Sequence, residues 1–145
     1  MVSAHDVAAY ILAQKGPMTT MKLQKLVYYS QAWHLVWTEA PLFEESIQAW
    51  ANGPVVRELY ERHRGKFTVE DWPEGDAGRL DEGCRESIDA VITFYGDKTA
   101  QWLSDLTHRE APWMLARQGL AAGERGDHVI SHADLHEYYS GLVAD

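Results

Sequence analysis

Residues 19–38 read TTMKLQKLVYYSQAWHLVWT and predict one long helix that is apolar on nearly every side. Its main face carries the i, i+3, i+4, i+7 spacing of a helical stripe: Leu23, Leu26, Val27, Ser30, Trp33, His34 and Trp37. Four polar side chains are expected to remain in water: Lys22, Gln24, Lys25 and Gln31. A hydroxyl cap at Thr19 or Thr20 suits the start of the helix. Because such a helix needs cover on nearly all sides, we expect the other segments to pack around it.

The neighbouring segments predict a second helix and a short strand. Residues 3–15 form the first helix, with Ser3 and Asp6 at capping-box spacing and Gly16-Pro17 as its stop. After Pro41 the 3.6-residue period is lost, so residues 47–50 are expected to be extended. Asn52-Gly53-Pro54 combines turn residues with a proline suited to the first turn of a helix, so it predicts a helix over 55–63.

The second half of the chain repeats this mainly helical pattern. Residues 67–78 are rich in Pro and Gly and predict a loop or a short hairpin. Helices are expected from about Asp81 to Tyr95, over 102–106, after Pro112 and after Ser131, with a short extended piece at 129–130. The expected fold is mainly α, with a small β element and a single domain over 1–145.

The charge balance favours a protein partner over nucleic acid. The formal net charge of −9 repels phosphate backbones and suits a basic protein. Residues 70–82 hold much of this charge and are best interpreted as a solvated acidic loop. No apolar run is long enough to span a membrane, and the first residues lack a signal peptide's pattern, so a cytoplasmic protein is expected. The single cysteine, Cys84, excludes an internal disulfide and is expected to be a core thiol.

Catalytic and metal-binding motifs are nearly absent. The sequence has no GxGxxG, Walker A, GxSxG or HExxH pattern. Zinc could use His128, His132 and His136 with Asp134 or Glu137, but Ala133 stands where a zinc protease needs its glutamate. We therefore expect no catalytic residue, no metal and no cofactor. A metal-dependent enzyme that uses the three histidines remains an alternative.

Three other polar positions receive structural interpretations. His34 lies on the buried stripe and predicts a core histidine bonded to a carbonyl or a tyrosine. The run His108-Arg109-Glu110 is expected to brace the start of the helix at Pro112. Lys22 and Lys25 are interpreted as a solvated helix face, with pairing to a partner's acidic groups as the alternative.

Several motifs in this sequence closely resemble the Panacea domain, a family of SocA-like and GepA-like antitoxins. The resemblance extends from about residue 3 to 142 and rests on MKLQKLVYYSQAW (21–33), PLFEE (41–45) and IQAWANGPVV (47–56). Leu106-Thr107-His108 with Pro112-Trp113 resembles a second signature, and 130–139 resembles the family's closing helix.

The resemblance implies an antitoxin that binds and inactivates a co-encoded toxin, as in a type II-like toxin–antitoxin pair. It also implies a mainly helical fold with a small β element. The family's toxins include small alarmone synthetases, Fic-like proteins and membrane-acting peptides. One member, SocA, instead works as an adaptor that delivers its toxin to the ClpXP protease, which gives a first alternative function. The expected partner is the cognate toxin, with a homo-oligomer or a hetero-oligomer with the toxin both open. Neither direct nucleic-acid binding nor a membrane partner is expected.

The contact surface is predicted from residue type and position alone. Aromatic side chains and arginines dominate many protein interfaces. The candidates are Trp50, Asn52, Arg57, Tyr60 and Trp72.

Overall fold

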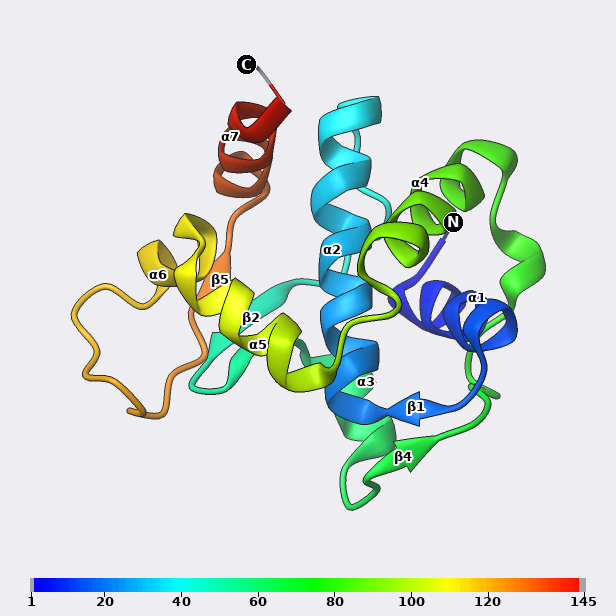
Figure 1. Ribbon diagram of the computed structural model, residues 1–145, viewed down its shortest axis with the longest axis horizontal. Coiled ribbons are helices and arrows are strands. Elements are labelled where there is room, and N and C mark those ends of the chain that lie inside the picture. The colour runs from blue at the N-terminus through cyan, green and yellow to red at the C-terminus, as the bar shows by residue number, and fades with distance from the viewer. Residues whose placement is uncertain (1, 144–145) are drawn as a thin grey trace.

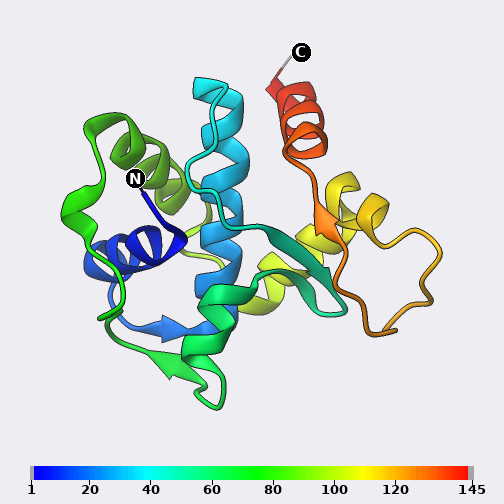
Figure 2. The same cartoon turned by 180° about the vertical axis from the view of Figure 1, so that it is seen from behind.

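The computed structural model describes residues 2–143 and places one long helix at the centre of a mainly helical fold (Figures 1 and 2). This helix, α2 (Thr20–Thr38), begins at Thr19, whose side chain accepts from the backbone N–H of Lys22. The predicted central helix is therefore confirmed, and so is the mainly α fold with a small β element. The predicted domain limits at 1 and 145 lie outside the described residues.

The described chain has six further helices: α1 (Ala4–Lys15), α3 (Arg57–His63), α4 (Glu82–Tyr95), α5 (Ala100–Arg109), α6 (Ala111–Ala116) and α7 (His132–Val143). The contacts of α2 with α4 and α7 are the most extensive, and α1 and α5 also pack on it. Ser3 and Asp6 form the predicted capping box at the start of α1. A short 3-10 turn, Ala77–Arg79, lies in the acidic segment before α4.

Two small antiparallel sheets complete the fold. Strands β1 (Met18–Thr19) and β4 (Thr68–Val69) pair with each other, so the predicted loop or hairpin at 67–78 instead contributes a strand to a distant segment. The second sheet has the order β3-β2-β5, with β2 (Ile47–Trp50), β3 (Gly53–Val56) and β5 (Val129–Ile130). In it β2 pairs with both neighbours, so this sheet joins the middle of the chain to the segment just before α7.

The helix predicted over 55–63 begins later than expected. Gly53–Val56 is strand β3, and α3 begins at Arg57. Pro54 pairs with Ala49 across a hairpin whose turn is Ala51-Asn52, and Gly53 adopts a φ of 128°. Two consecutive β-branched valines favour a strand, and the side chain of Gln24 binds both backbone groups of the second one. The turn signal was correct, but the proline belongs to a hairpin and not to a helix start.

Three polar side chains of α2 that were expected in water are buried: Gln24, Lys25 and Gln31. The amide of Gln24 bonds the N–H and the carbonyl of Val56 at 2.9 and 3.1 Å. The amide of Gln31 accepts from Leu42 N at 2.7 Å and donates to Phe43 O at 2.8 Å. Through these hydrogen bonds the two glutamines join the backbone of the segment 42–56 to α2. Neighbouring segments cover them, which their polarity gave no reason to expect.

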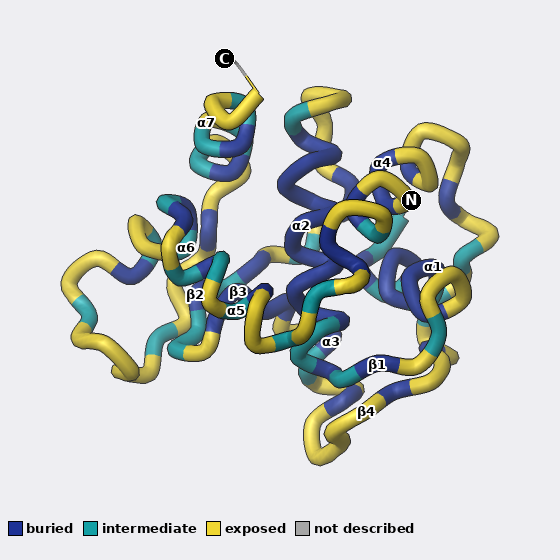
Figure 3. Tube along the Cα trace, viewed as in Figure 1, coloured by how far each residue is buried: buried dark blue, intermediate teal, exposed yellow. Residues whose placement is uncertain are grey.

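Burial follows α2 along most of its length and ends near its C-terminus (Figure 3). Trp37, predicted on the buried stripe, is 49% exposed because few segments reach the last turn. His34 is buried as expected, but its Nδ1 lies 2.8 Å from the hydroxyl of Ser87 and not beside a carbonyl or a tyrosine. Burial lowers the pKa of His34, which favours its neutral form. Cys84 is a buried free thiol, as predicted, and burial raises its pKa.

Candidate protein-interaction site at the hairpin tip

The tip of the β2–β3 hairpin is held by side chains from α5, α6 and the residue that follows α6. The carbonyl oxygens of residues 49 and 50 accept from Arg117 Nη1 and Trp113 Nε1, both at 2.9 Å. The carbonyl oxygen of residue 51 lies 3.1 Å from His108 Nε2, and that of residue 52 accepts from Ser104 Oγ at 3.0 Å. Because each of these four carbonyls has a side-chain partner within the chain, the backbone of the turn is already ordered before a partner protein binds. Such preorganisation lowers the entropy that binding must remove.

His108 and Glu110 therefore do more than brace the next helix. His108 and Arg109 belong to the last turn of α5, and Glu110 lies between α5 and α6. The His108 ring packs on the indole of Trp113, with 4.0 Å between ring centroids. Its Nδ1 lies 2.6 Å from the carbonyl of Ser104, while Nε2 points to the hairpin. Residues 107–109 therefore continue α5 past 106, where the sequence predicted that this helix ends, because the hairpin gives the end of α5 a surface to pack on.

The structure brings four of the five predicted contact residues onto the hairpin and α3. Trp50 and Tyr60 are half-buried and pack edge to face at 4.8 Å between centroids. Asn52 is exposed at the turn. Arg57 is exposed at the start of α3, where its Nε lies 3.4 Å from the carboxylate of Glu61. They combine aromatic area with one cation and one amide, a composition suited to a protein interface.

Trp72, the fifth predicted residue, lies away from the surface. It is only 5% exposed, and its indole N–H donates to Nδ1 of His5 at 3.0 Å. An edge-on contact with His63 joins it to the inner side of α3. The acidic segment that carries Trp72 is turned back onto α1, as shown by the bond from Asp76 N to the carboxylate of Asp6. Trp72 is therefore a core residue, and we remove it from the candidate surface.

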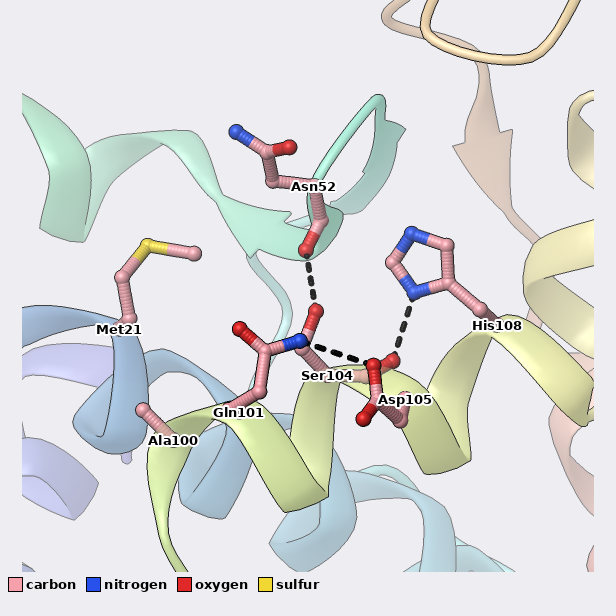
Figure 4. A pocket seen from close by; sticks show the side chains of 7 residues that line it. All are labelled: Met21, Asn52, Ala100, Gln101, Ser104, Asp105 and His108. Carbon is pink, nitrogen blue, oxygen red and sulfur yellow. Dashed lines mark hydrogen bonds between the residues drawn. The ribbon is translucent and has the colours of Figure 1, made fainter.

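A pocket of about 300 Å³ opens beside the hairpin tip (Figure 4). Met21 of α2, Asn52 of the turn and five residues of α5 line it: Ala100, Gln101, Ser104, Asp105 and His108. The carboxylate of Asp105 accepts from Gln101 Nε2 at 2.8 Å, so much of its polar lining is already paired within the chain. The pocket offers hydrogen-bonding groups and one acidic side chain but no cation, so its chemistry fits part of a protein contact.

Lys25 lies buried between α2, the hairpin and α5, in contrast to the solvated position predicted for it. Its side chain is 0% exposed, and within residues 2–143 its Nζ is the one buried side-chain nitrogen or oxygen without a hydrogen-bond partner. A Cβ added to Gly53 would lie 2.6 Å from Lys25 Cε and 3.0 Å from Nζ. Desolvation lowers the pKa of Lys25 to about 8. The backbone at Gly53 therefore packs directly against the buried amine of Lys25, and a residue with a Cβ at this position would clash with the lysine side chain.

A second buried polar cluster lies on the other side of α5. One carboxylate oxygen of Glu110, Oε1, accepts from the hydroxyls of Tyr29 and Tyr139, both at 2.7 Å. The Tyr139 hydroxyl also lies 3.0 Å from that of Tyr28, and the ring of Tyr95 stacks on Tyr29 at 4.1 Å. Burial raises the pKa of Glu110, and the two donated hydrogen bonds oppose that rise. This cluster joins α2 and α7 through the α5–α6 junction.

The three histidines considered for zinc are not brought together. His128 Nδ1 lies 3.0 Å from the carbonyl of Ala116, and His136 Nε2 lies 3.8 Å from the carboxylate of Glu39. Over the described residues, no group of three or more His, Cys, Asp or Glu side chains is placed to hold a metal ion. A metal-dependent enzyme built on His128, His132 and His136 is therefore not supported. Within residues 2–143, no helix is both long and apolar enough to cross a membrane.

Comparison with protein families gives one match. The family model described as antitoxin SocA-like, Panacea domain, matches residues 23–114, which is more than half of the chain. The matched range includes Lys25, the whole β2–β3 hairpin, α3 to α5 and Glu110. No curated protein and no solved structure matches the chain.

Proposed function

This chain belongs to the antitoxin SocA-like, Panacea domain family, and we propose that it neutralises a co-encoded toxin by binding it directly. The observation that carries the proposal is the family match over residues 23–114, which contains most of α2, the hairpin and most of the side chains that hold it. Binding without catalysis fits the described residues, where the polar groups at the hairpin serve the fold. We expect this to take place in the cytoplasm, in a complex of the two proteins.

The proposed mechanism is steric occlusion of the toxin by the hairpin surface, defined as Trp50, Asn52, Arg57 and Tyr60. Its backbone is fixed from the interior by α5 and α6, so the toxin meets a surface that is already ordered. The net charge of −9 favours encounter with a basic protein. Small alarmone synthetases are among the toxins that the family resemblance implies, and we propose this class, with a basic nucleotide or tRNA site as the part of the toxin that is covered.

Co-expression with the neighbouring reading frame tests the proposal. We expect the neighbour alone to arrest growth, and this chain to restore it while co-purifying with the neighbour in a stoichiometric complex. A neighbour that is harmless alone, or that remains lethal beside this chain, contradicts an antitoxin function. Restored growth without a complex, with toxin levels that recover in a protease-deficient strain, identifies the alternative of a proteolytic adaptor to a ClpXP-type protease.

A charge reversal on α3 tests the proposed surface. Arg57→Glu is expected to weaken toxin binding by about tenfold or more, because a carboxylate cannot make the hydrogen bonds that an exposed interface guanidinium donates. Arg62→Glu is the matched control, since Arg62 is exposed on the same helix outside the hairpin surface. Binding of purified proteins is measured by calorimetry. Equal affinities for both variants would remove Arg57 from the contact.

A further inference from the structure

A second surface is formed by side chains from the C-terminal turns of α2, α4 and α7. It consists of Trp37 from α2, Phe94 from α4, and Tyr138 and Leu142 from α7, and we name it the aromatic face. Trp37, Phe94 and Leu142 are 49%, 68% and 50% exposed. The ends of α2 and α7 point to the same end of the molecule, and both are exposed there (Figures 1 and 3).

Buried aromatic rings connect the members of this face. Trp37 stacks on Trp33 at 5.5 Å, and Trp33 donates its indole N–H to the hydroxyl of Tyr95. Phe94 packs edge to face on Tyr95 at 4.8 Å. On the other side, Tyr139 lies 5.5 Å from Trp33 and 5.0 Å from Tyr138.

Leu142 follows Tyr138 by one helical turn. The exposed side chains therefore surround one core cluster. Large apolar side chains grouped in this way are typical of interaction surfaces, whereas singly exposed ones need no explanation.

The α2 and α7 sides of the aromatic face carry acidic groups, together with His136, whose Nε2 lies 3.8 Å from the carboxylate of Glu39. The sequence contains no Lys or Arg over 26–56 or over 126–143, the two stretches that form its α2 and α7 sides. Neither helix has a basic residue in its last turn, so their partial negative charges are not balanced there. Glu39, with a side chain 79% exposed, follows α2 directly, and Glu137 is exposed on α7. On the α4 side, Lys98 follows Phe94 by four residues and has its Nζ 4.8 Å from the centroid of the Trp102 ring, while Lys15 is paired with Asp97 at 2.8 Å.

We propose that the aromatic face binds a basic amphipathic segment of the cognate toxin, whose apolar residues cover Trp37 and Phe94 while its Lys or Arg side chains reach Glu39 and the helix ends. This inference rests on the proposed antitoxin function and assigns it a second contact surface. An apolar strip flanked by cations complements both the exposed rings and the uncompensated charge. The hairpin surface differs in kind, since its two aromatic rings are half-buried and its exposed side chains are those of Asn52 and Arg57.

The test compares serine variants at exposed aromatic positions, with the purified product of the neighbouring reading frame as the probe. The double variant Trp37→Ser/Phe94→Ser is expected to raise the Kd for that protein by about tenfold or more. The matched control is Phe67→Ser, because Phe67 is 79% exposed and lies on the far side of the molecule, just before β4. Its Kd is expected to stay within about twofold of the wild-type value. Circular dichroism confirms that all variants are folded.

A charge variant adds an independent readout. Glu39→Lys is expected to weaken binding and to flatten the dependence of affinity on salt, while Glu70→Lys, the same change in the exposed acidic segment, leaves both unchanged.

If wild-type chain binds the toxin and the double variant binds equally well, the aromatic face is not the contact and the antitoxin function stands. If wild-type chain does not bind, both proposals fall. If the double variant abolishes only self-association of the chain, the face holds a second copy and the inference is overturned.

Discussion

Lys25 and Glu110 are two buried charged side chains of opposite sign, and the regions around them are built in different ways. Around Glu110, two tyrosine hydroxyls donate to one carboxylate oxygen at 2.7 Å, and aromatic rings pack around them. Around Lys25, the described residues offer its Nζ no hydrogen-bond partner. A buried charge with good partners maintains a unique arrangement, whereas one without partners lowers stability. The Glu110 region therefore supports the fold, and the Lys25 region is a local weakness directly beneath the hairpin surface.

The largest expected effect is at the well-paired site. Glu110→Ala is expected to lower the free energy of unfolding by about 4 kcal/mol, because two buried hydroxyls lose their acceptor and a cavity forms. Glu110→Gln keeps an acceptor oxygen and is expected to lose much less. Urea denaturation measures both variants. Similar losses for the two would show that the ionised carboxylate matters here, and that one acceptor oxygen in a side chain of the same volume does not replace it.

Replacement of Lys25 is expected to raise the free energy of unfolding, whereas replacement of Glu110 lowers it. In the folded chain its pKa is about 8, against 10.5 as the ordinary value, so Lys25→Met is expected to raise the free energy of unfolding by about 3 kcal/mol at pH 7. Between pH 8 and 10.5 the unfolded chain binds more protons than the folded one, so wild-type stability rises with pH in that window. The advantage of Lys25→Met should therefore be full below pH 8 and vanish above 10.5.

Denaturation of both proteins across this pH range measures that difference. An absent advantage would show that Lys25 has a partner such as bound water, and an advantage independent of pH would show that folding does not shift the pKa of Lys25.

A smaller loss of stability is expected from a substitution at Gly53, where the hairpin packs on Lys25. Gly53→Ala is expected to cost about 2 kcal/mol, because a residue with a side chain is strained at a φ of 128° and its Cβ would meet Lys25 Cε at 2.6 Å. Combining it with Lys25→Ala should recover the part due to the contact and leave the part due to backbone strain. Thermal denaturation of the single and double variants separates the two. Additive effects would mean that the close approach carries no energy.

The smallest effect probes one bond of the Glu110 cluster. Tyr29→Phe is expected to cost about 1 kcal/mol, since Glu110 keeps the hydroxyl of Tyr139 while the one hydrogen bond that Tyr29 donates disappears. Tyr138→Phe is the control, because no hydrogen bond is found for that half-exposed hydroxyl. Equal losses in chemical denaturation would contradict the proposed role of the bond to Glu110.

The predictions from sequence succeeded where neighbouring residues decide the outcome. Ser3 and Thr19 cap their helices as expected, because a cap needs only the next three residues. The strand at 47–50 was also correct. The helix start at Pro54 was wrong, because a proline after a turn suits a hairpin as well as a helix and the choice depends on pairing with 47–50. Trp72 and Lys25 were wrong in the same way, since distant segments cover both.

The sequence alone determined the central helix, the mainly α fold and the family resemblance, because each depends on residue types at fixed local spacing. Only the tertiary structure decided that Gln24 and Gln31 bind the backbone of 42–56 and that four carbonyls of the hairpin are held by α5, α6 and Arg117. It also decided that Lys25 Nζ has no hydrogen-bond partner among residues 2–143. A polar side chain has the same local preferences in water and in a core. Segments far away in the sequence decide whether the side chain is solvated, buried with a hydrogen-bond partner or buried without one. These segments meet only in the folded chain.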